Sequence, residues 1–233
     1  MENVSIQELY RGRYGYVNFY ERISHRIAFN KSNGLPRDFG HGITFDKIEC
    51  KPGEIRVDLP VSLGLDTAIF RIAILGLEPR VSHWKYNIER ITPYVFAAPF
   101  GIDRWTEGNK YYKSFNGLIN RDDCYLYFTD VVKEYEVKDS KRSGDIHARK
   151  EFWKKASNID NIKFLREEME LIKPTHIVAL GRYSYRFLKA NFGNIVYPVT
   201  HPNARQNRHT KENAWDLASR QLQDMLVDDS VLR

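Results

Sequence analysis

The chain has 233 residues, of which 42% are hydrophobic and 28% charged, so it can bury a core without metal or disulfide support. Lysine and arginine outnumber aspartate and glutamate by 36 to 30, and the resulting net charge of +6 suits a polyanionic partner such as nucleic acid. Two cysteines exclude a disulfide framework and a four-cysteine metal or iron–sulfur site within one chain. With no signal-like N-terminus and no apolar run near the ~20 residues that span a bilayer, a cytoplasmic monomer without a membrane partner is expected.

The N-terminal quarter differs in pattern from the rest of the chain. Residues 5–30 carry apolar side chains at roughly helical spacing, which predicts a helical extension. Residues 31–53 are rich in glycine and proline and are predicted to be loop. We therefore assign residues 1–60 to an extension packed on or near the core, and residues 61–233 to one α/β domain.

Short apolar runs alternate with helix-period stretches through this second part. The apolar runs are residues 70–75, 125–129, 176–181 and 195–200, and the helical stretches are residues 161–173, 182–192 and 212–226. Runs that are apolar on both faces, alternating with helices, are typical of a parallel sheet covered on both sides. The predicted fold class is therefore a three-layer α/β/α arrangement with a four-stranded parallel sheet.

Polar residues and glycines follow the four predicted strands. Glu78 comes shortly after the first strand and Asp130 after the second, while Gly181 opens a helix after the third and His201 follows the fourth. In an open parallel sheet the carboxyl ends of the strands lie at one edge, where ligands bind. These groups are therefore expected to converge, although they are far apart in the sequence.

Each of these groups also has a structural interpretation. Glu78 before Pro79 is compatible with a simple strand exit, Asp130 with an N-cap of a helix starting in the VVKEY segment, and His201 with a structural loop histidine. Gly181 leads a helix N-terminus that can hold an anion. The mixed-charge stretch 133–155 fits a solvated excursion better than a surface that follows phosphates.

Five short segments, in this order, resemble the uracil-DNA glycosylase superfamily over roughly residues 68–226. They are G-x-E-P at 76–79, A-P-F-G at 98–101, Y-F-T-D-V-V-K at 127–133, P-T-H-I-V-A-L-G at 174–181 and T-H-P-N at 200–203. The resemblance implies the glycosylase fold, with residues 1–60 as an addition to it. It also implies DNA, single- or double-stranded, as the partner, and no metal or cofactor.

The resemblance implies a role for each matching residue. Glu78 would position a water or stabilise the cationic sugar, and His201 would donate a hydrogen bond to the departing base, which makes these two the catalytic pair. Phe100 would stack on the flipped base, and Asp130 would read its edge. Arg205 would push into the duplex to fill the gap.

Further residues are predicted to complete the site. Gly76, Pro79 and Arg80 are expected to line the base pocket beside Phe100 and Asp130. DNA contacts are expected from residues at two of the strand ends besides Arg205, namely Gly181, Arg182, Ser184 and Asn203.

The residue types fit the chemistry of N-glycosidic bond cleavage, in which the sugar gains positive charge and the leaving base gains negative charge. A carboxylate on one side and a hydrogen-bond donor on the other stabilise both. Asp130 stands where the family usually has asparagine. An ionised carboxylate only accepts hydrogen bonds, so it favours a base edge with N–H donors over uracil, unless burial keeps Asp130 protonated.

The primary hypothesis is a DNA glycosylase acting on a flipped uracil-like or otherwise modified base. One alternative is a DNA-binding member without catalysis, in which the basic N-terminal segment and residues 133–155 hold the nucleic acid. The other alternative is a nucleoside or nucleotide hydrolase.

Overall fold

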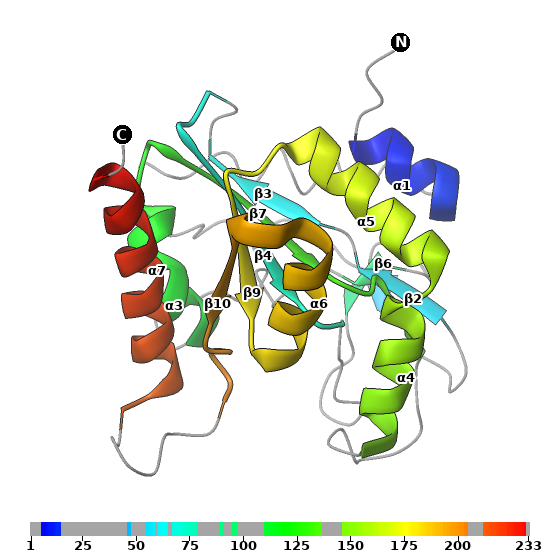
Figure 1. The fold of residues 1–233 in the computed structure, drawn as a ribbon. Coiled ribbons are helices and arrows are strands. Elements are labelled where there is room, and N and C mark those ends of the chain that lie inside the picture. Colours follow the sequence, from blue (N-terminus) through cyan, green and yellow to red (C-terminus); the bar gives the residue numbers. More distant parts are fainter. Residues whose placement is uncertain are drawn as a thin grey trace.

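The fold is described from a computed structural model (Figure 1). It describes residues 6–14, 46–47, 55–58, 60–64, 67–78, 89–90, 95–96, 110–136, 146–204 and 212–231.

A five-stranded sheet forms the centre of the molecule. Its order is β10 (Val196–Val199), β9 (His176–Leu180), β4 (Phe70–Gly76), β7 (Cys124–Asp130) and β3 (Val61–Leu63). The first four strands are parallel to one another, whereas β3 pairs with β7 in the antiparallel sense. The predicted four-stranded parallel sheet is confirmed, and β3 is an additional edge strand.

The central strands are buried on both faces, which is why they were recognisable as continuous apolar runs. Every side chain of β7 and of β9 is buried. The alternate residues of β4 divide between the two sides of the sheet, Ile72 and Ile74 lying in one core cluster and Ala73 and Leu75 in the other. Each cluster lies between the sheet and one layer of helices.

Helices cover the two faces of the sheet (Figure 1). On one face lie α3 (Lys110–Ile119) and α7 (Ala214–Val231), whose buried residues share a cluster with Ile72 and Ile74. The other face carries α4 (Ile146–Ala156), α5 (Ile159–Ile172) and α6 (Arg182–Phe192). A short 3-10 turn, η3 (Gly193–Ile195), leads into β10. The three-layer prediction is confirmed.

The ends of α5 show why this stretch is helical. Asn158 is its N-cap, and the side-chain oxygen accepts a hydrogen bond from the backbone N–H of Asp160 at 2.8 Å. Lys173 ends the helix in the left-handed conformation, and its N–H donates to the carbonyl of Met169 at 2.8 Å. Pro174 follows and prevents continuation, so the chain turns into β9.

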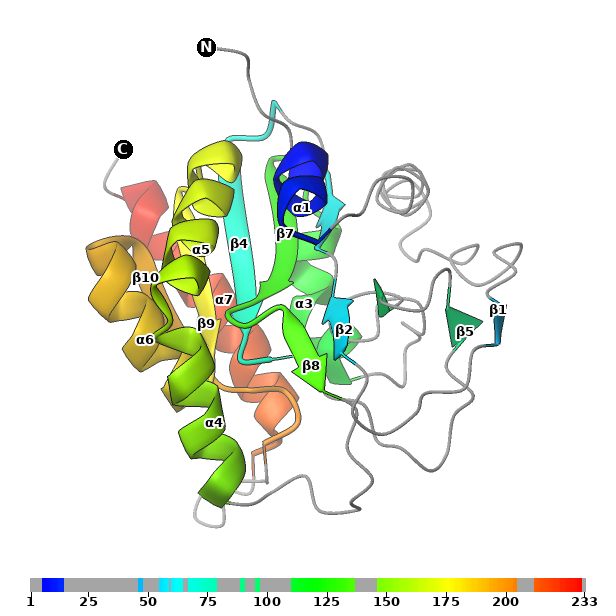
Figure 2. The same ribbon diagram turned by 90° about the vertical axis from the view of Figure 1, so that its right-hand side faces the viewer.

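Smaller elements lie outside the main sheet. One ladder pairs β1 (Asp46–Lys47) with β5 (Glu89–Arg90), and a second sheet has the order β6 (Val95–Phe96), β2 (Ile55–Asp58), β8 (Glu134–Glu136). Figure 2 shows β8 leading away from the end of β7 toward β2.

The N-terminal helix α1 (Ile6–Tyr14) packs against α5 (Figure 1). Its Tyr10 side chain is 2% exposed and belongs to the core cluster that contains Ile72 and Ile74. Of the predicted helical extension at residues 5–30, the structure describes this helix, and residues 15–30 lie outside the described residues. The boundary at residue 60 stays a prediction.

Two helices were not predicted, and one alternative is wrong. Neither α3 nor α4 stood out by apolar period, although α3 buries Tyr112, Phe115, Leu118 and Ile119 at helical spacing. No helix begins after Asp130, because the chain bends at 131–133 and continues as β8. The N-cap interpretation of Asp130 is therefore excluded.

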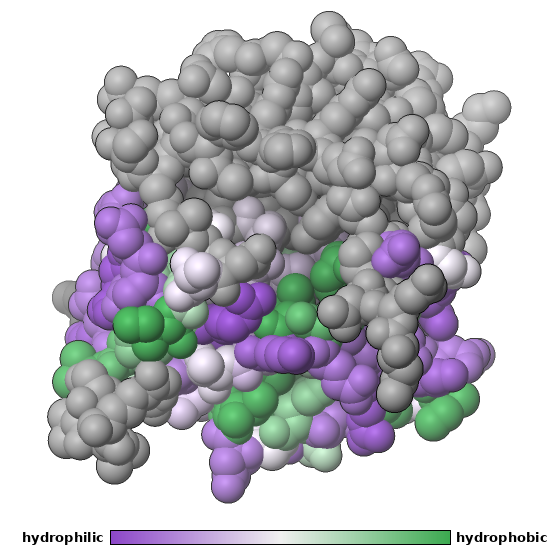
Figure 3. Space-filling view, turned by 90° about the horizontal axis from the view of Figure 1, so that it is seen from above, coloured by the Kyte–Doolittle hydropathy of each residue, from purple (hydrophilic) through white to green (hydrophobic). Residues whose placement is uncertain are grey.

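The surface seen from above is mostly hydrophilic in its described part, with hydrophobic residues in separate small groups (Figure 3). The large apolar side chains exposed in the described segments are Ile69, Ile159, Ile195 and Val227. Such scattered residues are ordinary on a protein surface.

The strand order places a switch point between β4 and β9. The first described helix after β4 is α3, on one face of the sheet, and the first after β9 is α6, on the other face. In open α/β sheets, ligands bind outside the carboxyl ends of the strands at such a point.

Candidate functional site

The carboxyl ends of β4 and β7 run side by side. Gly76 is paired with Asp130 in the strand register. Two further hydrogen bonds continue the pairing beyond the strands, from Val131 N–H to the carbonyl of Gly76 at 3.1 Å and from Val132 N–H to the carbonyl of Leu77 at 3.0 Å. This pairing brings the segment carrying half-buried Glu78 alongside the segment carrying Asp130.

Gly181 connects the other two strand ends. Its N–H donates to the carbonyl of Val199, the last residue of β10, at 2.8 Å. Its φ of 84° lies in the region that favours glycine, and a Cβ built there would lie 3.5 Å from the Cβ of His201. The turn into α6 therefore lies directly against the histidine. His201 is adjacent to the β4–β9 switch point, because β9 is the neighbour of both β4 and β10.

Hydrogen bonds within the loop orient His201. The backbone N–H of Asn203 donates to His201 Nδ1 at 3.2 Å, and the N–H of Ala204 donates to the His201 carbonyl at 2.8 Å. A ring nitrogen that accepts a hydrogen bond carries no proton, so the neutral imidazole carries its proton on Nε2. His201 is thus arranged as a donor through Nε2.

Tyr111 is the residue that the sequence analysis missed. It lies in the first turn of α3, and its hydroxyl oxygen is 3.4 Å from His201 Nε2. The edge of one ring faces the other, with centroids 5.8 Å apart. The side chain of Asn203 lies close enough to this hydroxyl to lower its pKa. Tyr111 therefore contacts His201 from α3, a helix that lies between Glu78 and His201 in the sequence.

The protonation of Tyr111 is set by its surroundings. Burial raises the pKa of its hydroxyl, the negative charge of Asp130 raises it further, and the hydrogen bond from Asn203 lowers it in part. The net effect is a pKa well above the ordinary value, so the hydroxyl stays neutral. The same interaction shows that Tyr111 lies within electrostatic reach of Asp130, which is itself 5% exposed.

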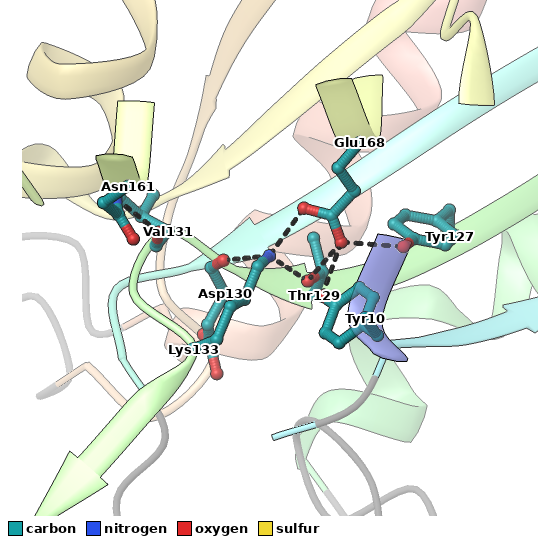
Figure 4. A network of polar contacts seen from close by, with 8 residues as sticks. All are labelled: Tyr10, Tyr127, Thr129, Asp130, Val131, Lys133, Asn161 and Glu168. Carbon is teal, nitrogen blue, oxygen red and sulfur yellow. Dashed lines mark hydrogen bonds and ion pairs between the residues drawn. The ribbon is translucent and has the colours of Figure 1, made fainter. Parts of the chain in front are cut away.

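A buried polar network supports the segment that carries Asp130 (Figure 4). The Lys133 ammonium contacts Glu168 Oε2 at 2.8 Å, with the two side chains 1% and 0% exposed. It also donates to the Thr129 hydroxyl and to the backbone carbonyl of Asp130. The Lys133 side chain is therefore buried and points toward Thr129, Asp130 and Glu168. This corrects the expectation that residues 133–155 begin a solvated segment.

Glu168 collects further hydrogen bonds at its other oxygen (Figure 4). Oε1 accepts from the hydroxyls of Tyr10 and Tyr127, each at 2.7 Å, and from Thr129 at 3.2 Å. Nearby, the Asn161 amide donates to the carbonyl of Val131 at 3.2 Å. Helices α1 and α5 and strand β7 thereby fix the backbone on both sides of Asp130.

The predicted DNA-contacting residues differ in their exposure to solvent. Arg182 is exposed in the first turn of α6, and Asn203 is exposed in the loop after β10. Ser184, by contrast, is fully buried below that first turn. Pro79, Arg80, Phe100 and Arg205 lie outside the described residues, so their predicted roles stay predictions.

The model of a protein family described as the uracil DNA glycosylase superfamily matches residues 69–223, more than half of the chain. The chain belongs to the uracil DNA glycosylase superfamily. The matched segment runs from the residue before β4 into α7, so it includes all four parallel strands. No curated protein matches the chain at a significant level.

Membership gives the general chemistry of this glycosylase-superfamily protein. The superfamily consists generally of hydrolases that act on DNA as glycosylases. Within the described segments, no three histidine, cysteine or acidic side chains are grouped so that they could hold a metal ion. Among the helices described, none is long and apolar enough to cross a membrane.

Proposed function

We propose that this protein is a monofunctional DNA N-glycosylase that removes a flipped, uracil-like or otherwise modified base. The observation that supports it most is the orientation of His201, whose Nδ1 is occupied by the Asn203 N–H and whose Nε2 carries the donor proton. The donor stands at the carboxyl edge of the sheet, next to the switch point and on the same edge as Glu78 and Asp130.

In the proposed reaction, His201 stabilises the negative charge that develops on the base and Glu78 the positive charge that develops on the sugar. The bond between the base and the anomeric sugar carbon breaks, and its electron pair leaves with the base. His201 Nε2–H donates a hydrogen bond to the negative charge on the base. Glu78 stabilises the cationic sugar or orients the water that adds to it, and water supplies the hydroxyl of the abasic product.

The remaining residues would hold the flipped base and the strand. Phe100 stacks on the base, and Gly76, Pro79 and Arg80 complete its pocket. Base flipping of this kind is needed because the reacting atom is otherwise inside the stack. Two groups of residues are assigned to DNA. The backbone of the DNA is contacted by the helix N-terminus at Gly181, Arg182 and Ser184 and by Asn203 in the loop after β10. Arg205 fills the gap that the flipped base leaves in the duplex. With Ser184 buried, its contribution would come through the helix N-terminus.

The direct test is an excision assay on a panel of oligonucleotides. Single- and double-stranded DNA carrying uracil, hypoxanthine, xanthine or modified cytosine is incubated with the protein, and abasic sites are cleaved with alkali. Strand breaks at one or more of these bases are expected. Absence of breaks on every substrate would reject the catalytic assignment, and base release from a free deoxynucleoside at the same rate would favour a nucleoside hydrolase.

Asp130 is expected to set which base is accepted. Its carboxylate only accepts hydrogen bonds, whereas the amide of an Asp130→Asn variant both donates and accepts, as the uracil edge requires. For this variant we expect a rise in the ratio of two excision rates, that for uracil divided by that for a base whose edge carries N–H donors. The rise should be about 5- to 150-fold, the equivalent of about 1–3 kcal/mol for one bidentate base contact. The assay compares relative single-turnover rates across the panel.

The matched control for this change is Asp122→Asn, in the exposed turn before β7. It removes the same charge away from the site, so the order of substrates should stay that of the unchanged protein. An unaltered order in Asp130→Asn would show that Asp130 does not read the base.

Arg182 is expected to contribute one phosphate contact. Its replacement by alanine should reduce the slope of log affinity against log salt by about 0.9 for duplex and about 0.7 for single-stranded DNA, measured by fluorescence anisotropy between about 50 and 200 mM salt. Arg186→Ala is the control, because that exposed arginine lies one turn further from Gly181. Equal slopes for the two variants would remove Arg182 from the DNA interface.

A further inference from the structure

Tyr111 has no part in the proposed reaction, yet it contacts the residues that do. Its hydroxyl oxygen is 3.4 Å from His201 Nε2, and the side chains of Asn203 and Asp130 both affect the pKa of this hydroxyl. Its ring is held in place from below by Phe115, one turn along α3, with the rings nearly parallel at a centroid distance of 6.5 Å. Phe115 is itself fully buried, so the position of the Tyr111 ring is tied to the core.

The hydrogen-bonding capacity of the two groups decides the direction of their contact. Nδ1 of His201 already accepts from the Asn203 N–H, so Nε2 of the neutral ring is the donor. The Tyr111 oxygen is therefore the acceptor in this pair. A tyrosine hydroxyl is already neutral near pH 7 at its ordinary pKa near 10, and burial and the charge of Asp130 raise the pKa of Tyr111 further, so this oxygen does not belong to a phenolate.

A neutral acceptor at this distance holds the imidazole proton only weakly. The separation of 3.4 Å exceeds the usual range of about 2.7–3.2 Å for N–H···O bonds. A phenolate would bind the proton through a stronger, charge-assisted bond. The arrangement thus keeps the ring oriented while leaving Nε2–H available to an acceptor that carries more negative charge, such as a departing base.

We propose that Tyr111 is a positioning residue for His201, which holds the Nε2–H group at the carboxyl edge of the sheet in the free protein and yields it to the base as the glycosidic bond breaks. The proposal rests on the proposed glycosylase function for its second half. The first half, the orientation of His201 in the free protein, can be measured without any substrate.

The first experiment is nitrogen and proton NMR of the full chain with isotope-labelled histidine. A His201→Gln variant identifies the signals of His201 among the seven histidines. The unchanged protein is expected to show His201 protonated at Nε2. In Tyr111→Phe, which keeps the ring and removes the hydroxyl, exchange of that proton with water should accelerate roughly 2- to 3-fold, the lower end of the effect of one hydrogen bond, because the contact is long.

Tyr112→Phe provides the matched control. It is the same substitution at the next position of the same helix, but Tyr112 is buried in the cluster between α3, α7 and the sheet. The His201 signals should be the same as in the unchanged protein. If Tyr111→Phe also leaves them unchanged, the proposal is overturned whether or not the protein cleaves DNA.

The second experiment measures excision with the best substrate of the panel. Tyr111→Phe is expected to lower the single-turnover rate by about 10- to 100-fold, with DNA affinity changed less than about 3-fold, because misplacement of a catalytic group affects the transition state more than binding. In a His201→Ala background the same substitution should have no further effect on the rate. An equal loss in both backgrounds would show that Tyr111 acts independently of His201 and would overturn the proposal.

The two experiments separate the two claims. Failure of the glycosylase proposal appears as no excision by the unchanged protein, and the NMR comparison then still decides whether Tyr111 orients His201. Failure of the positioning proposal appears as unaltered His201 signals in Tyr111→Phe beside an active, unchanged protein.

Discussion

Replacing Glu168 by alanine is expected to lower the free energy of unfolding by about 3–5 kcal/mol, because the change leaves the buried Lys133 ammonium without its carboxylate. The hydroxyls of Tyr10 and Tyr127 lose their shared acceptor at the same time. Urea denaturation followed by circular dichroism gives the free energy. The slope of that transition should be unchanged, since the surface exposed on unfolding hardly differs.

Glu167→Ala is the control for this prediction. Glu167 is the preceding residue of α5, is partly exposed, and faces Lys163 at 3.9 Å on the surface. A surface pair of this kind contributes about 0–1 kcal/mol, so the control should remain close to the unchanged protein. If the two variants lost stability equally, the buried network would not hold α1, α5 and β7 together as its contacts indicate.

A double substitution distinguishes the ion pair from the packing around it. Lys133→Met together with Glu168→Met replaces both charges by apolar chains of similar length, which in buried pairs is often neutral or stabilising. Recovery of part of the stability lost in Glu168→Ala is expected. The recovery should be incomplete, because the hydroxyls of Tyr10 and Tyr127 still lack the carboxylate oxygen.

The parts of the fold that could be predicted from the sequence are those with a strong local signal. The strands β4, β7 and β9 are almost completely buried, so each stands in the sequence as a mainly apolar run between turn residues, with Arg71 as the charged residue within β4. Their parallel arrangement follows from the intervening helices, and it predicts that the residues after the strands lie at one edge of the sheet, whereas the pairing of Gly76 with Asp130 comes from the strand order of the structure. Strand β3 has three residues and carried no such signal.

Site residues could be predicted where they stand at the end of a strand. They could not be predicted where contacts between distant elements bring a side chain to the site. Asp130 is the last residue of β7 and His201 is the second residue after β10, so the topology brings both to one edge of the sheet. Tyr111 reaches the same edge from α3, whose aromatic-rich first turn has no motif, and only the helix period of its buried residues signals the helix. Lys133 looked like the start of a charged surface run because its partner Glu168 lies far along the chain.

The second large effect is expected at the catalytic pair. His201→Ala should lower the single-turnover excision rate by about 100- to 1000-fold, the usual loss when one donor aimed at developing negative charge is removed. Glu78→Gln keeps the size of the side chain and removes the charge that would stabilise the cationic sugar, so a loss of similar size is expected. Alkali-cleavable sites in an oligonucleotide carrying the preferred base report both rates.

DNA affinity decides what these losses mean. A catalytic role predicts that the dissociation constant of either variant stays within about 3-fold of that of the unchanged protein, since the interactions removed form in the transition state. Unfolding must be checked in parallel, because His201 is packed against Gly181 and Tyr111. Excision by both stable variants at the original rate would remove Glu78 and His201 from catalysis. Binding without excision by the unchanged protein, retained in both variants, would instead identify a DNA-binding member of the superfamily that uses the same edge of the sheet without breaking the glycosidic bond.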